Sequence, residues 1–353
     1  KYIQGRDALL QFQKEMGYMG HRWLFICSRS GYHACHEKFE KSFISSNDYR
    51  KYEIFGGISS HSEINKMKSI VAEENIDTVV GVGGGSAVDT AKATAFYTGK
   101  HVVIVPTVAA TDAPCTDLSI IYNDDHSFDK YLFYPINPDA VMVDTKVIAN
   151  APVKFLIAGM GDALGTYFEG RASLRTESAS LEGTGITRAG MALARLCYDT
   201  LRQYGRQALE ACKVHAVTPA LEYVIEANVY LSGVGADNVN CAAPHSFYNG
   251  VTAMGIKPAD HGCCVAFGTL VQLVLEGAPK EEFEEVQNFC VEVGLPITLE
   301  EIGVTTTDQV KMIAQKACVP WETIHNLAGD VQPVELYDAI MQADAMGKLI
   351  LGK

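Results

Sequence analysis

Two histidines and one aspartate are the residues of this sequence best suited to hold a metal ion. His245 and His261 stand sixteen positions apart, and Asp162 lies far upstream in the apolar stretch LIAGMGDALG. Two imidazoles and a carboxylate are typical protein ligands of a catalytic zinc ion, whose fourth position stays open for water or substrate. The spacing alone leaves open the commoner outcome, in which a buried histidine is satisfied by hydrogen bonds.

Local sequence indicates how these three residues could meet. Asp162 is flanked by glycine and alanine, and a carboxylate buried there must be paired, hydrogen-bonded or bound to a metal. His245 follows two alanines and a proline and should open a helix. His261 precedes an apolar helical segment over residues 265–275. Imidazoles on neighbouring helices could therefore point into one cleft.

A glycine-rich turn is the second feature with chemical meaning. The segment GVGGGSAVD at 81–89 follows a strand-like run and opens a helix, which is where backbone N–H groups can bind a phosphate. The spacing matches neither the G-x-G-x-x-G fingerprint nor a Walker loop. Ser86 and Asp89 could add hydrogen bonds to a cofactor. A tight turn with a purely structural role is the alternative.

The pattern of apolar residues predicts an α/β part followed by an all-α part. Up to about residue 144, β-rich runs alternate with helical segments, which indicates a parallel sheet with helices on its faces. The strand-like runs cover residues 23–27, 51–55, 78–82, 102–105 and 140–143, and a hairpin is expected over 119–122 and 128–134. From residue 154 onward nearly every window is helical, with Gly255 and Pro258 among the breakers. We therefore expect a dinucleotide-binding domain over 1–150 and a helical metal- and substrate-binding domain over 151–353.

Composition excludes several classes of protein. The formal charge is −13 and the basic residues are scattered, so nucleic acid and anionic membranes are not expected partners. No apolar run approaches the roughly 20 residues of a membrane span, and no signal-peptide pattern opens the sequence. The ten cysteines lie mostly inside apolar segments, as expected for reduced, buried thiols of a cytoplasmic protein.

Seven segments occur in an order that resembles the glycerol dehydrogenases of the metal-dependent, iron-containing alcohol dehydrogenase family. They are GVGGGSAVDTAKA, VPTVAATDAPCTDLSIIY, INPDAVMVDT, AGMGDAL, HSFYNG, HGCCVAFG and ETIHN. The resemblance covers essentially the whole chain. It implies a dehydroquinate synthase-like fold, in which an α/β nucleotide domain is paired with a helical metal domain.

The resemblance also assigns roles to individual residues. It makes Asp162, His245 and His261 the metal ligands, and Asp112 the aspartate that contacts substrate. Many iron-binding relatives have a further histidine where this chain has Thr166, so the resemblance implies zinc. The residues implied along NAD(H) are Gly84, Gly85, Ser86 and Asp89 at the pyrophosphate, and Thr107, Ala110, Thr116, Leu118 and Tyr122 along the nucleotide.

Three departures from the family pattern affect these expectations. Ser28 stands where glycerol dehydrogenases usually have an aspartate that binds the ribose hydroxyls and repels a 2′-phosphate, so NADP(H) is expected as a cofactor beside NAD(H). Tyr248 replaces a second histidine before Asn-Gly, which puts a proton relay there in doubt. Cys263-Cys264 replaces a charged pair. Both thiols are soft metal ligands by type, but adjacent cysteines cannot easily both bind one ion. The substrate pocket is therefore expected to differ.

These observations favour a zinc-dependent dehydrogenase that interconverts glycerol or a related 1,2-diol and its ketone. A small polyol is the expected partner, and a homo-oligomer, octameric by resemblance, is the expected assembly. A hydroxycarboxylate or 2-oxoacid reductase of the same family is the main alternative. An enzyme of this fold with a phosphate-bearing substrate would need a basic cluster near Asp112 and Asp162, and none is apparent. A non-catalytic descendant is disfavoured because the three presumed ligands and the glycine turn are retained.

Overall fold

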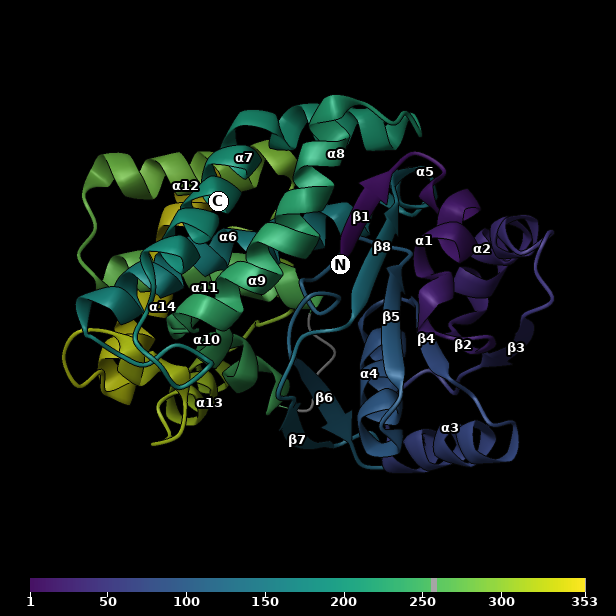
Figure 1. Ribbon diagram of the computed structural model, residues 1–353. Coiled ribbons are helices and arrows are strands. Elements are labelled where there is room, and N and C mark those ends of the chain that lie inside the picture. The colour runs from purple at the N-terminus through teal and green to yellow at the C-terminus, as the bar shows by residue number, and fades with distance from the viewer. Residues whose placement is uncertain (255–258, 353) are drawn as a thin grey trace.

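A parallel sheet with helices on both faces forms one side of the molecule, and a bundle of helices forms the other (Figure 1). The computed structural model describes residues 1–254 and 259–352. Gly255 and Pro258, which we interpreted as helix breakers, lie outside the described residues.

Within that described part, six strands form the parallel sheet in the order β1-β8-β5-β4-β2-β3. Their bounds are Tyr2–Gly5 for β1, Arg22–Cys27 for β2, Tyr49–Ile54 for β3, Thr78–Gly83 for β4, His101–Pro106 for β5 and Ala140–Asp144 for β8. An antiparallel hairpin, β6 (Leu118–Tyr122) and β7 (Phe128–Phe133), is inserted between β5 and β8. The five strand-like runs and the hairpin predicted from the sequence are confirmed to within two residues. β1 was missed, because it is short and its four residues are only half apolar.

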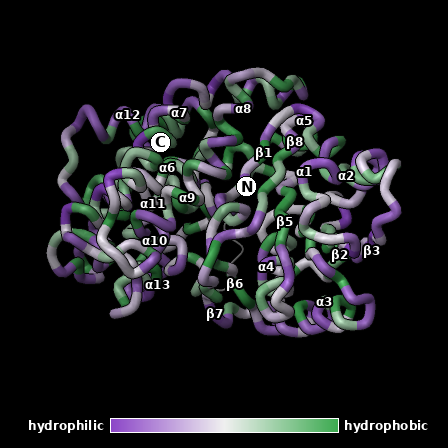
Figure 2. Tube along the Cα trace, in the orientation of Figure 1, coloured by the Kyte–Doolittle hydropathy of each residue, from purple (hydrophilic) through white to green (hydrophobic). Residues whose placement is uncertain are grey.

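Alternate residues of β2 explain why the sheet is covered on both sides. Leu24 and Ile26 belong to the same apolar cluster as Ala91 of the α4 helix, whereas Trp23 and Phe25 pack in the cluster that holds the first two helices of the chain. Residues on opposite sides of a strand point to opposite faces of the sheet. Figure 2 accordingly shows hydrophobic residues along the central strands and hydrophilic residues on the outer loops and helices.

The helices divide into two sets along the chain. Those beside the sheet are α1 Phe12–Met16, α2 Arg29–Ser42, α3 His61–Glu73, α4 Gly85–Thr98 and α5 Thr145–Ala149. Those of the bundle are α6 Val153–Arg175, α7 Arg188–Lys213, α8 Pro219–Glu226, α9 Ser232–Val239, α10 Ala243–Thr252, α11 His261–Leu275, α12 Lys280–Val293, α13 Thr307–Ala317 and α14 Pro333–Ile350. A π-helical turn, Ala227–Leu231, joins α8 to α9, and short 3-10 turns cover Ala8–Gln11, Gly17–Met19, Glu300–Ile302 and Thr323–Asn326. No strand follows β8 in the described residues, as the sequence predicted.

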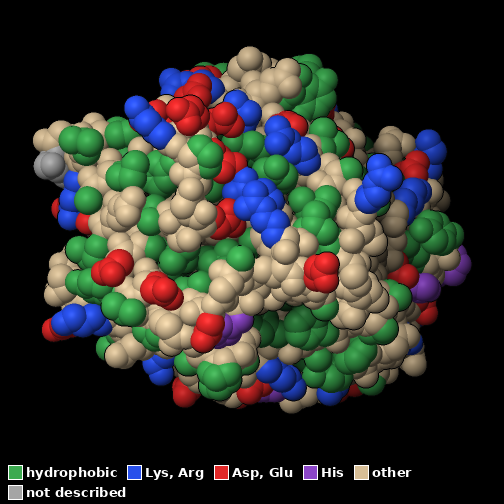
Figure 3. Space-filling view, turned by 90° about the vertical axis from the view of Figure 1, so that its left-hand side faces the viewer, with side chains coloured by type: hydrophobic (Ala, Val, Ile, Leu, Met, Phe, Trp, Pro, Cys, Tyr) green, Lys and Arg blue, Asp and Glu red, His purple; other side chains and the backbone are tan. Residues whose placement is uncertain are grey.

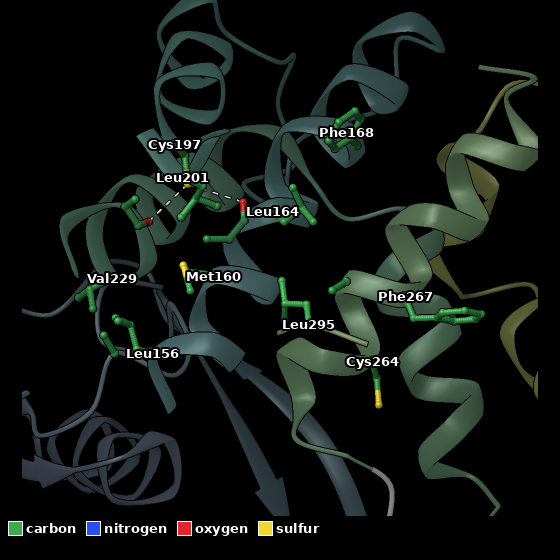
Figure 4. Packing of buried hydrophobic residues seen from close by; sticks show 14 of the residues in the cluster. Leu156, Met160, Leu164, Phe168, Cys197, Leu201, Val229, Cys264, Phe267 and Leu295 are labelled. Carbon is green, nitrogen blue, oxygen red and sulfur yellow. Dashed lines mark hydrogen bonds between the residues drawn. The ribbon is translucent and has the colours of Figure 1, made fainter. Parts of the chain in front are cut away.

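The long α6 helix is the centre of the bundle. Its apolar residues Leu156, Met160 and Leu164 point into the packed interior that Figure 4 shows, which also holds Cys197 and Leu201 of α7. The thiol of Cys197 donates to the carbonyl oxygens of α6 and of the π-helical turn, at 3.6 and 3.4 Å. The same helix also carries the buried polar residues Asp162 and Glu169.

Charged side chains lie on the surface, and most cysteines lie in the interior. Acidic and basic side chains are interspersed on the face in Figure 3. All ten cysteines are described, and each is a free thiol, most of them buried. None of the described helices is long and apolar enough to cross a membrane.

Candidate active site

Asp162, His245 and His261 come together as the sequence predicted. One ligand atom from each residue lies within 4.8 Å of the others. The Nε2 atom of His261 lies 3.0 Å from Oδ1 of Asp162, and Nε2 of His245 lies 3.7 Å from the same oxygen. Asp162 is buried, whereas about a quarter of each imidazole is exposed, at 27% and 25%. The donor set and its reach thus fit a divalent metal ion that a small molecule can approach.

Two glycines beside these ligands explain how α6 and α11 place them. A Cβ atom on Gly262 would lie 1.8 Å from the carbonyl oxygen of Ala158, and one on Gly161 would lie 2.2 Å from the carbonyl oxygen of Gly262. No side chain fits between backbones that are this close. Since Gly161 precedes Asp162 and Gly262 follows His261, the contact between the two helices fixes the distance between these two predicted ligands.

Asp112 reaches the same point from the sheet side. It lies in the loop after β5, and its backbone N–H donates to Oδ2 of Asp162 at 3.4 Å. Its own carboxylate accepts a hydrogen bond from Ser232 at 2.8 Å. A second α6 glycine, Gly159, permits this approach, since a Cβ there would lie 1.9 Å from the carbonyl oxygen of Ala109. Asp162 therefore has one oxygen facing the imidazoles and one facing this loop.

The two aspartates have opposite pKa shifts. Burial, together with the nearby charge of Asp162, raises the pKa of Asp112 to about 6, although the Ser232 hydrogen bond opposes the rise. Burial also acts to raise the pKa of Asp162, but the facing His261, its hydrogen bond and then His245 outweigh that effect and lower it. Asp162 is thus the carboxylate held ionised against the imidazoles, as a metal ligand must be.

The sequence reasoning missed Glu169. This buried residue lies two turns after Asp162 on α6, and its Oε2 atom is 2.8 Å from Nδ1 of His245. Its Oε1 atom accepts from the backbone N–H groups of Ala242 and His245, at 2.7 and 3.3 Å. A carboxylate that accepts the Nδ1 proton leaves the Nε2 lone pair for a metal. The seven-residue spacing from Asp162 was the available signal.

The glycine turn lies at the carboxyl edge of the sheet, where neighbouring strands β2, β4 and β5 end. Ser28, Gly84 and Thr107 each follow one of these strands directly. A Cβ atom on Gly84 or Gly85 would meet only ordinary contacts, at 3.5 Å or more, so the space in front of the turn is open. This edge of an open parallel sheet is where nucleotides bind, and the open turn fits a pyrophosphate.

The other residues expected along the nucleotide surround this edge unequally. Ser86 lies in the first turn of α4, and Ala110 lies half-buried in the loop after β5. Asp89 turns toward β6, where its Oδ2 atom accepts from the N–H of Ile120 at 3.3 Å. Half-buried Tyr122 ends β6. The contacts of these residues with a cofactor stay predictions.

A buried lysine shapes the loop that carries Asp112. Lys92 of α4 donates to the carbonyl oxygens of Ala113, Thr116 and Leu118, the first at 2.8 Å and the second at 3.3 Å. The positive charge thus replaces regular secondary structure as the partner of these carbonyl groups. Thr116 and Leu118 are held against α4 by this contact.

A separate hollow of about 730 Å³ opens at the amino-terminal ends of β4 and β5, where Lys100 and His101 line it. It lies at the opposite edge of the sheet from the glycine turn. Asp162, His245 and His261 are not among the residues that line it.

Known proteins with the same fold and similar sequences place the chain in a family. Residues 1–145 match the model of the iron-containing alcohol dehydrogenases. A glycerol dehydrogenase of Escherichia coli O6:H1 is 44% identical over 354 residues, which cover 99% of this chain and 96% of that protein. The chain belongs to the iron-containing alcohol dehydrogenase family.

Solved structures agree. The crystal structure of glycerol dehydrogenase from Schizosaccharomyces pombe has a TM-score of 0.93 at 35% identity, over 99% of this chain and 91% of that one. A probable glycerol dehydrogenase from Sinorhizobium meliloti 1021 has a TM-score of 0.91 at 36% identity, over 99% and 98%. The predicted resemblance and fold class are confirmed, and the chain is an alcohol dehydrogenase of a metal-dependent family.

Thr166, which stands where many iron-binding members have a histidine, makes a different contact. Its hydroxyl lies 2.9 Å from that of Ser232, which in turn donates to Asp112. Thr166, on α6, therefore supports Asp112 through Ser232. Among the described residues, the metal group that contains Asp162 has two further members, His245 and His261.

Tyr248 and the cysteine pair take positions beside the group. The ring of Tyr248 packs edge-on against that of His261, with centroids 4.3 Å apart. Cys264 is buried in the apolar interior of the bundle, and its thiol donates to the carbonyl oxygen of Ala259 at 3.7 Å. The half-buried Cys263 is outside the metal groups found among the described residues. Tyr248 is thus the departure that touches a predicted ligand directly.

Removing the carboxylate behind His245 should weaken metal binding. Glu169→Ala leaves the Nδ1 proton and the Ala242 N–H without their acceptor, and we expect the affinity for zinc to fall by about 10- to 100-fold. Glu169→Gln keeps an acceptor oxygen, so its affinity for zinc should fall by less than that of Glu169→Ala. Competition with a chromophoric chelator measures both affinities. Equal zinc affinity in the alanine variant and the unchanged protein would refute this role.

Proposed function

We propose that this enzyme is a zinc-dependent dehydrogenase that interconverts glycerol, or a related small 1,2-diol, and its ketone with a nicotinamide cofactor. The observation that carries the proposal is the convergence of Asp162, His245 and His261 beside Asp112, at a point that a small molecule can approach. Glycerol dehydrogenases aligned over nearly the whole chain support the substrate class.

The metal and the cofactor fit the residues present. Three ligands of nitrogen and oxygen with an open fourth position favour zinc over an octahedral ion. Bound zinc supplies Lewis acidity to a hydroxyl group, and the nicotinamide accepts the hydride. In this proposal residues 1–150 bind the dinucleotide through Gly84, Gly85 and the edge around them, and residues 151–353 hold the metal. The assembly is proposed to be a cytoplasmic homo-oligomer.

The chain's own groups bind and orient the polyol. Asp112 offers a carboxylate whose geometry is fixed by Ser232 and by its backbone contact to Asp162. That carboxylate can accept a hydrogen bond from the hydroxyl next to the reacting one. Glu169 keeps the His245 ring in the orientation and tautomer that metal binding requires. Substrate binding and metal binding are thus supported from opposite sides of Asp162.

The same contacts favour a neutral polyol over a hydroxycarboxylate. Among the described side chains that contact the metal group, Asp112 lies against Asp162, Glu169 lies against His245 and the ring of Tyr248 lies against His261. A substrate carboxylate would approach the carboxyl group of Asp112, and like charges at close range raise the free energy of binding. A diol gains a hydrogen bond at the same position.

Activity with pairs of alcohols tests the proposal. A vicinal diol offers a second oxygen to the metal and to Asp112, so propane-1,2-diol should be oxidised with a kcat/KM at least about tenfold above that of propan-1-ol. Asp112→Ala should lower the ratio of kcat/KM between the diol and the mono-alcohol. Absorbance of the reduced nicotinamide follows the reaction. Equal efficiency for the two alcohols would contradict the proposal, and strong preference for 2-oxoacids would establish the hydroxycarboxylate alternative.

Ser28 is proposed to relax the choice between NAD and NADP. It caps α2 by accepting from the N–H of Gly31 at 3.0 Å, and Arg29 and Ser30 beside it are exposed. We expect measurable activity with NADP, and Ser28→Asp should lower the NADP to NAD ratio of kcat/KM by about ten- to a hundredfold. Ser69→Asp, which adds the same charge on the exposed side of α3, is the control. An unchanged protein that ignores millimolar NADP would refute the role of Ser28.

A further inference from the structure

A second group of metal-binding atoms lies behind the first. Glu169, Cys241 and His245 each offer one atom, a carboxylate oxygen, a sulfur and a ring nitrogen, and these three atoms lie within 4.8 Å of one another. The residues come from α6, from the turn between α9 and α10, and from α10. Neither Glu169 nor Cys241 belongs to the ligand set of the proposed catalytic metal.

The two groups lie on opposite sides of one imidazole ring. The Nε2 atom of His245 lies 3.7 Å from Asp162, in the first group. Its Nδ1 atom lies 2.8 Å from Oε2 of Glu169, in the second. His245 is therefore the one residue that the two groups share.

The second group is held in place before any ion binds. Backbone N–H groups of Ala242 and His245 hold Oε1 of Glu169, so Oε2 keeps its position against the ring. Asn326 holds the backbone of Cys241 by donating to its carbonyl oxygen at 2.8 Å. Cys241 and His245 are half-buried, while Glu169 is buried, so an ion has access from the side of the thiol.

We propose that Glu169, Cys241 and Nδ1 of His245 form an inhibitory site for a thiophilic divalent cation such as Cd²⁺, or Zn²⁺ in excess. Sulfur, imidazole nitrogen and carboxylate oxygen are the ligand types that zinc takes in proteins, and the sulfur selects for soft ions. This inference rests on the proposed function, since it assumes that the metal group around Asp162 is catalytic.

Inhibition follows from the chemistry of the shared ring. Binding displaces the proton of the Cys241 thiol and requires a lone pair on Nδ1, because only deprotonated groups are metal ligands. A neutral imidazole then carries its proton on Nε2. That nitrogen has no lone pair left for the catalytic metal, so the two ions compete for His245. Occupation of the second site thus withdraws one of three protein ligands from the first.

The zinc-loaded enzyme titrated with Cd²⁺ alone tests the proposal by two readouts. Ultraviolet difference absorption reports the bond between cadmium and a thiolate, and dehydrogenase activity reports inhibition. In the unchanged enzyme the absorption band should grow as activity falls. Cys241→Ser should abolish the band and raise the cadmium concentration for half-inhibition by at least about tenfold. Cys318→Ser removes a half-buried thiol at the end of α13 and should behave as the unchanged enzyme.

Each outcome decides the matter. A band or an inhibition midpoint that is the same in Cys241→Ser and the unchanged enzyme overturns the site, as does loss of both effects in Cys318→Ser. If no polyol is oxidised at all, the proposed function fails, yet the absorption band still tests the site. A band that is lost in Cys241→Ser then supports cadmium binding at the second group, and a band unchanged in that variant overturns it.

Discussion

Replacing His245 with alanine should remove the bound metal and abolish turnover. The variant keeps Asp162 and His261 but loses the imidazole nitrogen that completes the three-ligand group. A Lewis-acidic metal contributes several kcal/mol to the stabilisation of the transition state, and each 1.4 kcal/mol changes a rate tenfold. We therefore expect kcat/KM for glycerol to fall by about a thousandfold or more.

Metal content measured by mass spectrometry of the purified variant, beside its circular dichroism, checks this prediction. His325→Ala is the matched control, because His325 is exposed and its Nε2 atom is hydrogen-bonded to the carbonyl oxygen of Val319, away from the metal group. That variant should keep both metal and activity. Native metal content in folded His245→Ala protein would refute the ligand assignment.

Adding one methyl group at Gly262 should damage both the fold and the site. The new Cβ atom would lie 1.8 Å from the carbonyl oxygen of Ala158, and backbone atoms cannot move aside as a flexible side chain can. Overpacking of this kind costs about 1–3 kcal/mol, and more where the backbone itself must shift, and the helices can relieve it only by separating. Since His261 adjoins the contact, we expect a lower melting temperature and weaker zinc binding together.

Gly235→Ala on α9 is the control for this variant. Its Cβ would meet only ordinary contacts, 3.4 Å and beyond, and the change to alanine should stabilise the helix by roughly 0.5–1 kcal/mol. Thermal unfolding followed by circular dichroism compares the two variants. A Gly262→Ala protein with unchanged melting temperature and zinc affinity would show that the close contact of α6 and α11 does not set the site.

The convergence of Asp162, His245 and His261 could be predicted from sequence because their residue types are rare in such apolar surroundings, and their role as metal ligands stays a prediction that the family resemblance implies. Asp162 stands in a segment that would otherwise be buried without charge, and the histidines flank predicted helix starts. The alternation of short apolar runs likewise predicted the strands of the parallel sheet. Such features depend on a few neighbouring residues, so one sequence carries them.

Features that depend on contacts between distant segments could not be predicted. Glu169 supports His245 only because α6 and α10 pack together, and the two residues are 76 positions apart. The same holds for Lys92, whose contacts with the Asp112 loop depend on how that loop turns over α4. The glycine beside Asp162 was visible in the sequence, but its reason, the backbone of α11, was not.

Reconstitution with zinc tests the central claim most directly. The protein is stripped of metal with a chelator, returned to increasing amounts of Zn²⁺, and assayed with glycerol and NAD⁺ by the absorbance of the reduced nicotinamide. Because Asp162, His245 and His261 form one group, activity should be absent without metal and reach its maximum at one zinc per chain. Full turnover of glycerol by the metal-free protein would contradict the account.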